Sequence, residues 1–216
     1  MRKNGTSYWG SGVLTSIYGK ADKHEGFSKI VRDITEQKSL HELALHSSTH
    51  DFLTGLPNKR FFEENLIYSI QDTKKKYLLA LLYLDFNNFK TINDDKGHKI
   101  GDFVLIEIAA RLTKNTRKSD MAARLGGDEF VILTKGFKGK KDIENFAKKI
   151  VKIFRTPLKI EKKMVNVSVS VGLAVYPLDG KTPKALLHRA DEALYAAKKS
   201  GGNQYKFYEN NGKRKV

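Results

Sequence analysis

The chain has 216 residues, with 40 Lys and Arg against 24 Asp and Glu, which gives a formal net charge of +16 at neutral pH. Its length fits one full domain plus an appendage, and its 40% hydrophobic and 10% aromatic content excludes an intrinsically disordered chain. The absence of Cys excludes disulfides, thiolate-held metals and a cysteine nucleophile, so any metal must be held by oxygen or imidazole.

The excess of positive charge is compatible with a nucleic acid, a membrane surface or a phosphorylated small molecule as the partner. The Lys residues are spread along the chain and are not interleaved with aromatic stacking motifs, so we expect no nucleic-acid partner. The longest apolar run, residues 77–84, is far shorter than the roughly 20 residues of a membrane-spanning helix, so we expect no membrane segment. Without Cys or a signal-type apolar block in residues 1–20, the expected location is the cytoplasm.

The first part of the chain predicts an incomplete unit followed by a helix. Short strands are expected over residues 12–18 and 26–31, and two strands alone bury too little surface to be independently stable. Over residues 35–48 the pattern becomes helical, with Leu40 and Leu43 on one stripe. This segment suits either an ordinary packed helix or a dimerising connector.

The remaining elements alternate between helices and strands. Asn58 is a good N-cap for a helix, and residues 77–86 form an apolar run typical of a strand buried on both faces, with a polar loop after it. The segments expected beyond that loop are a helix at 100–115, a Gly-Gly hairpin of strands 121–125 and 130–134, a helix at 143–154, a half-buried strand at 165–175, a helix at 183–200 and a short strand at 205–208. This order predicts an α+β fold of the ferredoxin-like type, with an antiparallel-rich sheet flanked by helices.

Three carboxylates stand where they could hold a metal. Asp85 ends the buried strand, and Asp128 and Glu129 occupy the hairpin tip, so all three converge if the hairpin lies beside that strand. Oxygen ligands of this kind suit Mg²⁺ (or Mn²⁺), and a cation would relieve their mutual repulsion. Asp128 and Glu129 are also compatible with an ordinary turn, in which Gly126 and Gly127 need only supply positive φ.

Lys90, Asn93 and Asp102 follow Asp85 and together supply a cation, an amide and a carboxylate. The amide and carboxylate can pair with the edge of guanine while the ammonium meets a phosphate, so the set can recognise a nucleotide. Asp102 could equally favour a helix N-terminus through the helix dipole. We expect His98 to be a structural hydrogen bonder, because no second His lies at metal-ligand spacing.

Six blocks of sequence keep a fixed order along the chain. They are DFLTGLPN at 51–58, DFNNFKTIND at 85–94, GHKIGD at 97–102, RLGGDEF at 124–130, SVGLA at 170–174 and ADEALYAAK at 190–198. Together they resemble the GGDEF family of bacterial diguanylate cyclases, and IVRDIT at 30–35 resembles the end of a PAS sensor domain. The domains implied are a PAS remnant at 1–35, a helical linker at 36–50, a GGDEF catalytic domain at 51–210 and a basic tail at 211–216.

The resemblance implies a palm-like sheet similar to that of nucleotidyl cyclases. It also implies an enzyme that condenses two GTP into cyclic di-GMP with release of two pyrophosphates, and a homodimer, because each subunit would bind one GTP. By the same resemblance Mg²⁺ would be held by Asp85, the backbone carbonyl of Phe86, Asp128 and Glu129; the catalytic residues would be Asp128, Glu129 and Lys198; and the substrate would contact Lys90, Asn93, Asp102, Leu105, Gly126 and Gly127.

Arg117 and Asp120 form an RxxD motif just upstream of Gly126. This offset matches the inhibitory product site of the family, so inhibition by cyclic di-GMP is expected. The plain alternative is a surface ion pair.

Two positions depart from the usual pattern of the family: Asn87 stands where Asp is common, and Gly202 stands where Arg is common. The missing guanidinium predicts a raised KM for GTP, which Lys199 would compensate only in part, since an ammonium does not reproduce an Arg fork. The alternative function is a catalytically weak GGDEF module that acts as a receptor for GTP or cyclic di-GMP.

Overall fold

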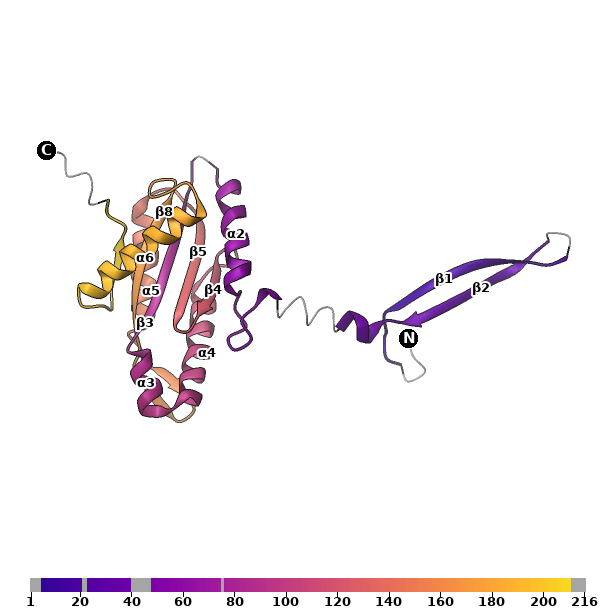
Figure 1. Ribbon diagram of the computed structural model, residues 1–216, viewed down its shortest axis with the longest axis horizontal. Coiled ribbons are helices and arrows are strands. Elements are labelled where there is room, and N and C mark those ends of the chain that lie inside the picture. The colour runs from indigo at the N-terminus through magenta and orange to yellow at the C-terminus, as the bar shows by residue number, and fades with distance from the viewer. Residues whose placement is uncertain (1–4, 21–22, 40–47, 75, 211–216) are drawn as a thin grey trace. The chain divides into compact units, whose positions relative to one another are not determined.

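The computed structural model describes residues 5–20, 23–39, 48–74 and 76–210, and the chain divides into two compact units, Met1–Ser48 and Thr49–Val216 (Figure 1). In the first unit, β1 (Gly10–Tyr18) pairs antiparallel with β2 (His24–Asp33), and both strands are longer than the sequence pattern suggested. Residues 35–39 are helical, whereas residues 40–47 of the predicted helix lie outside the described residues. Within the described ranges, no helix combines the length and the apolar character that a bilayer crossing needs.

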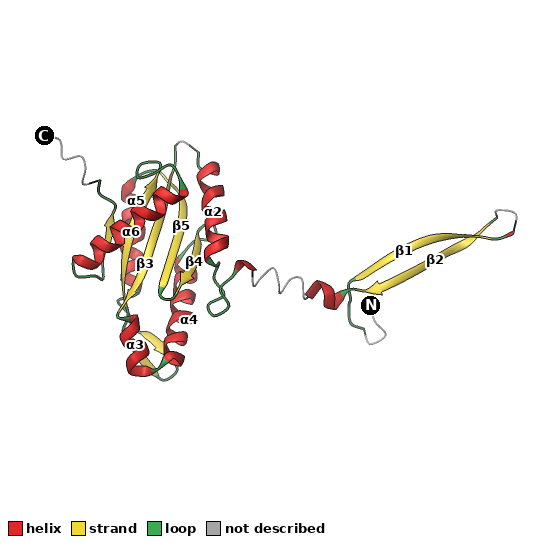
Figure 2. Ribbon diagram, viewed as in Figure 1, coloured by secondary structure: helices red, strands yellow, loops and turns green. Residues whose placement is uncertain are grey.

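A sheet of five strands organises the second unit (Figure 2). The strands, in spatial order, are β4 (Met121–Gly126), β5 (Glu129–Phe137), β3 (Leu78–Asn87), β8 (Ser168–Tyr176) and β9 (Tyr205–Phe207). Every neighbouring pair is antiparallel except β8 and β9, which run parallel. With helices between β3 and β4 and between β5 and β8, this order is that of the ferredoxin-like fold, which confirms the predicted fold class.

Helices cover both faces of this sheet. On one face, α2 (Lys59–Asp72) and α6 (Pro183–Lys199) pack against the odd-numbered residues of β3, and on the other, α4 (His98–Asn115) and α5 (Lys140–Ile153) pack against its even-numbered residues. Asn58 caps α2 as predicted, accepting a hydrogen bond from the backbone N–H of Phe61. The central strand is therefore buried on both sides over most of its length, and partly exposed residues alternate with buried ones from Tyr83 to its end.

Strand β8 differs from its prediction because it too is buried on both faces. The alternation of its sequence separates large from small residues: Val171 and Leu173 face α5, whereas Gly172 and Ala174 face α6. A Cβ built on Gly172 would lie 2.0 Å from the carbonyl oxygen of Ala190, so only glycine allows α6 to approach this closely. The period of two in the β8 sequence therefore reflects large side chains on one face and small ones on the other, not one buried and one solvent-exposed face.

Two further boundaries depart from the sequence analysis. The predicted polar loop after β3 is a short helix, α3 (Phe89–Lys96), which periodicity could not reveal because only Ile92 is buried in it. The predicted strand at 165–175 is split: β7 (Lys163–Val165) pairs with β6 (Leu158–Ile160) in a separate hairpin, and β8 begins at Ser168. The alternating Val residues continue across this break, so the pattern did not signal it.

Candidate active site

The acidic residues selected from the sequence lie at one edge of the sheet. β3 and β5 pair so that Asp85 is the cross-strand partner of Glu129, and Asp128 lies in the turn between β4 and β5. Cross-strand partners place their side chains on the same face of a sheet, and here that face is the one that α6 covers. The fold therefore brings the strand end and the hairpin tip together, as the sequence analysis required.

Asp128 belongs to the same electrostatic cluster as Asp85. Burial, followed by the negative charge of Asp85, raises the pKa of the Asp128 carboxyl, while the charges of Lys198 and Arg124 act in the opposite direction. The two carboxylates are thus close enough to repel each other, and a bound cation would relieve that repulsion.

The hairpin turn depends on two glycines. Gly126 has φ +152° and Gly127 has φ +52°, and a Cβ on either residue would meet open space. Backbone conformation, not crowding, therefore requires glycine here, and the backbone of the turn remains open to an approaching group.

Helix α6 carries Lys198 to this cluster. Its Nζ lies 2.6 Å from Oδ2 of Asp85, and the Lys198 side chain is 43% exposed whereas that of Asp85 is 16% exposed. The ammonium therefore stands between the acidic cluster and solvent, where it can also meet an anionic group of a substrate.

The donor set at this edge fits a hard cation only in part. Among the described residues, no group of three or more His, Asp and Glu side chains is placed to hold a metal ion. A cation beside Asp85 and Asp128 would need additional oxygen donors, for which the Phe86 carbonyl and substrate phosphates are suited. The residues present therefore fit a metal that binds together with a phosphorylated ligand.

The residues selected for nucleotide recognition lie on two packed helices and not in a loop. Lys90 and Asn93 are one turn apart on α3, while Asp102 and the buried Leu105 belong to α4. The Oδ1 atom of Asn93 is buried without a hydrogen-bond partner, and a Cβ on Gly101 would lie 1.8 Å from it. A buried acceptor without a partner is destabilising. A ligand N–H that donates to the Asn93 Oδ1 atom would remove this cost.

The RxxD motif forms a compact turn. The backbone N–H of Arg117 donates to Oδ2 of Asp120 at 2.9 Å, and the Thr134 hydroxyl donates to Oδ1 at 2.6 Å. The exposed Arg117 guanidinium lies over the Phe137 ring, 5.7 Å from its centroid. Arg117 and Asp120 are therefore neighbours whose side chains serve different contacts, in place of the surface ion pair that was the plain alternative.

Sequence reasoning missed the contact that anchors the hairpin. Arg124 donates from Nη1 to Oδ1 of Asp51 and from Nε to the carbonyl of Gly127, both at 2.9 Å. Although burial opposes it, hydrogen bonds from Thr54 and Arg124 lower the pKa of Asp51. Both residues lie in the ordered sequence blocks, but nothing in their spacing showed that these blocks meet.

The two departures from the family pattern lie side by side. Asn87 exchanges hydrogen bonds with Ser168 and Ser170 of β8, and a Cβ on Gly202 would lie 3.3 Å from the Asn87 Oδ1 atom. The position without the expected acid and the position without the expected base are thus neighbours in the fold. The Lys199 ammonium lies over the Tyr195 ring, 4.7 Å from its centroid. Because it already makes this contact, Lys199 is a poor substitute for the missing Arg.

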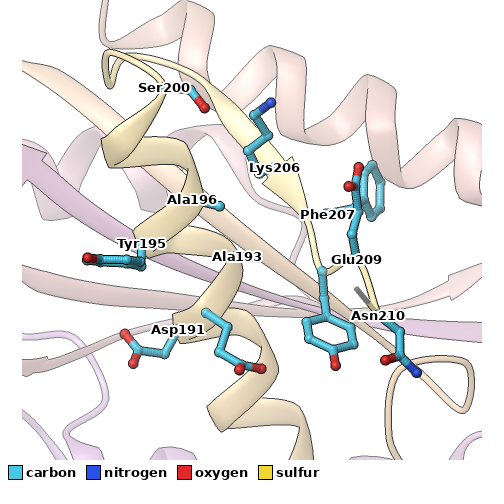
Figure 3. A pocket seen from close by; sticks show the side chains of 11 residues that line it. Asp191, Ala193, Tyr195, Ala196, Ser200, Lys206, Phe207, Glu209 and Asn210 are labelled. Carbon is cyan, nitrogen blue, oxygen red and sulfur yellow. The ribbon is translucent and has the colours of Figure 1, made fainter. Parts of the chain in front are cut away.

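A groove of about 710 Å³ lies along α6 and β9 (Figure 3). Glu192, Lys206 and Glu209 are among its lining residues. None of the site residues selected from the sequence, all of which the structure describes, lines this groove.

The second unit thus combines a mostly antiparallel sheet, an acidic cluster at the end of its central strand and a buried amide oxygen on α3. Residues 48–204 match the family model described as diguanylate cyclase, GGDEF domain. The chain therefore belongs to the GGDEF family.

Curated relatives and solved structures agree with this assignment. The chain is 40% identical over 171 residues to the diguanylate cyclase TpbB of Pseudomonas aeruginosa, and 42% identical over 173 residues to the bifunctional diguanylate cyclase/cyclic di-GMP phosphodiesterase MucR of the same species. These alignments cover 78% and 80% of this chain but only 39% of TpbB and 24% of MucR. The crystal structure of the TpbB GGDEF domain superposes with a TM-score of 0.71 at 39% identity, covering 73% of this chain and 99% of that one.

Proposed function

We propose that this chain condenses two molecules of GTP into cyclic di-GMP with release of two pyrophosphates. The observation that carries the proposal is the pairing of Asp85 with Glu129, which gathers the acidic residues of two segments beside Asp128. The relative TpbB is named a diguanylate cyclase, and the GGDEF domain of DgcB from Caulobacter crescentus, 28% identical with a TM-score of 0.68, was solved with cyclic di-GMP.

The acidic edge would hold the divalent cation. Asp85, the Phe86 carbonyl, Asp128 and Glu129 supply oxygen donors of the type that Mg²⁺ or Mn²⁺ prefers. Bound there, the cation would lower the pKa of the attacking hydroxyl and neutralise charge on the departing pyrophosphate.

The other residues would orient the nucleotide. Asn93 and Asp102 read guanine beside Leu105, which satisfies the unpartnered Asn93 oxygen, and Lys90 and Lys198 bind the phosphates. The open backbone at Gly126 and Gly127 leaves room for the phosphates to approach the hairpin.

Proton removal falls to the hairpin carboxylates. In each half-reaction, the ribose 3′-hydroxyl loses its proton and forms a bond to the α-phosphorus of the other GTP, and the bond to pyrophosphate breaks. Asp128 or Glu129 would accept this proton; burial and the negative charge of Asp85 raise the pKa of Asp128, which favours proton uptake there.

Two chains are needed, because each GTP attacks the other and one site holds a single GTP. A homodimer that places two acidic edges face to face supplies the required orientation. Since GTP is its substrate and the chain contains no Cys, we place the protein in the cytoplasm.

Product would bind at Arg117 and Asp120. The exposed Arg117 guanidinium is available to guanine and phosphate, and the turn made by the Asp120 carboxylate holds it in place. Binding of cyclic di-GMP at this turn would inhibit the enzyme.

We also propose that residues 1–35 are the closing strands of a PAS sensor, that residues 36–50 link it to the GGDEF domain at 51–210, and that residues 211–216 form a basic tail. In support, β1 and β2 expose large apolar side chains, with Val13 66% and Ile30 74% exposed. Two strands with such surfaces need further strands or another partner to cover them.

Incubation of the chain with GTP and Mg²⁺, followed by nucleotide chromatography, tests the proposed function. We expect cyclic di-GMP to form at a rate that rises more than linearly with protein concentration, and none to form with Asp128→Asn. The control variant, Asp142→Asn in the exposed first turn of α5, should retain activity. Absence of cyclic di-GMP at every protein concentration would reject the proposal.

The receptor alternative rests on Gly202, which leaves one expected cation missing near the phosphates. If it is correct, the chain will bind GTP or cyclic di-GMP in equilibrium dialysis and yet form no product in the assay above.

A further inference from the structure

Helix α5 and the hairpin that follows it carry much of the positive charge of the chain. Residues 138–163 contain ten Lys and Arg against three Asp and Glu, so this stretch contributes +7 to the net charge of +16. All ten of these cationic residues are exposed. Although Lys residues occur throughout the chain, nearly half of its net charge thus lies on one surface segment.

The amphipathic pattern of α5 turns its lysines toward solvent. The apolar residues Ile143, Ala147 and Ile150 are buried in the core on the sheet face opposite α6. Lys148 and Lys152 therefore lie on the solvent side of the helix, one turn apart.

The hairpin of β6 and β7 extends this charged surface. Leu158 and Val165 are cross-strand partners buried in the same core cluster as α5, whereas the next pair, Lys159 and Met164, is exposed. Lys162 stands exposed at the hairpin turn.

Arg111 of α4 ties the end of α5 to the start of the hairpin. Its guanidinium donates to the carbonyl oxygens of Ile153 and Thr156 at 3.0 and 2.6 Å and to that of Pro157 at 3.2 Å. These three bonds hold the connection between α5 and β6 against α4. The lysines of the helix end and of the hairpin therefore belong to one continuous, fixed surface.

Most of these charges have no acidic partner. Among the residues that the structure describes, only Lys141 and Lys148 of the ten form ion pairs, and both pair with Glu144. The unpaired cations at the end of α5 and on the hairpin form the basic surface, which consists of Lys152, Arg155, Lys159, Lys162 and Lys163. Like charges gathered in this way repel one another, so an anionic partner would stabilise the arrangement.

The make-up of the basic surface favours lipid over nucleic acid as that partner. Four of its five cations are Lys, which acts as a point charge, and not Arg, whose planar fork suits specific phosphates and bases. Neither aromatic residue of 138–163, Phe146 or Phe154, is exposed, so these residues offer no platform for stacking bases. Met164, 63% exposed beside Lys159, instead offers an apolar side chain that can enter the interface of a bilayer.

We propose that the basic surface docks on an anionic lipid bilayer. The lysines meet the negative headgroups, and Met164 enters the region between headgroups and acyl chains. Docking requires neither GTP nor metal, so it is independent of the proposed function and can be tested without turnover.

Sedimentation of the chain with lipid vesicles tests the proposal. Vesicles of phosphatidylcholine with about one third phosphatidylglycerol present an anionic surface, whereas vesicles of phosphatidylcholine alone do not. We expect the chain to bind the first kind and not the second. Binding should weaken as NaCl rises from about 0.1 M to about 1 M, because the Debye length shrinks from about 10 Å to about 3 Å.

A triple variant that combines Lys152→Gln, Lys159→Gln and Lys162→Gln locates the contact. Each Lys near an anionic surface strengthens binding by about fivefold, so we expect this variant to bind the anionic vesicles about 100-fold more weakly.

The matched control removes the same amount of charge elsewhere. It combines Lys59→Gln, Lys181→Gln and Lys184→Gln, three exposed lysines on α2 and around the start of α6. These helices cover the other face of the sheet, so the control should bind within about threefold of the wild type, because charges more than a Debye length from the lipid are screened.

Absence of binding to the anionic vesicles at about 0.1 M NaCl would overturn the proposal. Equal weakening in the two triple variants would also overturn it, because the attraction would then follow net charge and not the basic surface. If the chain binds a mixed-sequence DNA duplex but not the vesicles, and the first variant loses that binding, the partner is a nucleic acid and the lipid proposal is wrong.

Discussion

Substitution of Gly172 by Ala tests how the fold connects α6 to the acidic edge. The new Cβ would lie 2.0 Å from the Ala190 carbonyl oxygen and 2.2 Å from the Leu194 nitrogen, both of which belong to the backbone of α6. Ordinary contact begins near 3.4 Å, so the helix must move by about 3.4 − 2.0 = 1.4 Å. Backbone atoms cannot turn aside as a flexible side chain can, so the whole helix has to shift.

This shift should affect stability and activity together. Overpacking of this kind lowers the free energy of unfolding by about 1–3 kcal/mol, and we expect the upper end, about 3 kcal/mol, because the clash involves backbone. Since α6 carries Lys198, which lies 2.6 Å from Asp85, a displacement of more than 1 Å should also reduce cyclase activity by about 100-fold.

Urea unfolding and the rate of cyclic di-GMP formation measure the two effects. Gly139→Ala is the matched control: its Cβ would meet open space and its φ of −158° suits any residue, so only a weak N-cap preference is lost, worth less than about 1 kcal/mol. A Gly172→Ala protein with wild-type stability and activity would refute the account of how α6 is held.

Three further changes test other parts of the site. Asp51→Asn should lower the free energy of unfolding by about 1–3 kcal/mol at pH 7, because it weakens the partly buried contact with Arg124. The folded-state pKa of Asp51 is lowered from 3.8, so this stabilisation is present above that value and is lost as the pH falls through the folded-state pKa. Urea titrations should therefore show a smaller difference between variant and wild type at pH 3 than at pH 7, and an equal difference at both would contradict the assignment. Arg117→Ala should retain cyclase activity and lose inhibition by added cyclic di-GMP, and full inhibition of the variant would show that the product site is elsewhere. Gly202→Arg should lower the KM for GTP while it lowers the free energy of unfolding by about 1 kcal/mol, because φ there is +67°; an unchanged KM would show that the missing guanidinium has no effect on substrate binding.

The sequence was most informative where burial imposes a pattern. The apolar run that became β3 and the Gly-Gly turn both predicted their elements, and together they placed Asp85 beside the hairpin. The pattern failed where a segment buries too little, as in α3, or where two elements share one alternation, as in β7 and β8. The periodicity of apolar residues indicates which positions are buried. The helix α3 and the break between β7 and β8 are instead defined by backbone hydrogen bonds, which periodicity does not reveal.

The parts of the site that could not be predicted are contacts between distant segments. The pair formed by Asp51 and Arg124 joins residues 73 positions apart, and the neighbours Asn87 and Gly202 are further apart still. Such contacts depend on how the elements pack and on the register between strands, which the sequence does not encode locally.

The most direct test of the central claim is a crystal structure of the chain with Mg²⁺ and a non-hydrolysable GTP analogue. The account predicts that the metal contacts Asp85 and a hairpin carboxylate, and that guanine meets the Oδ1 side of Asn93. A nucleotide bound elsewhere, for example in the groove between α6 and β9, with no cation at the acidic edge, would contradict it.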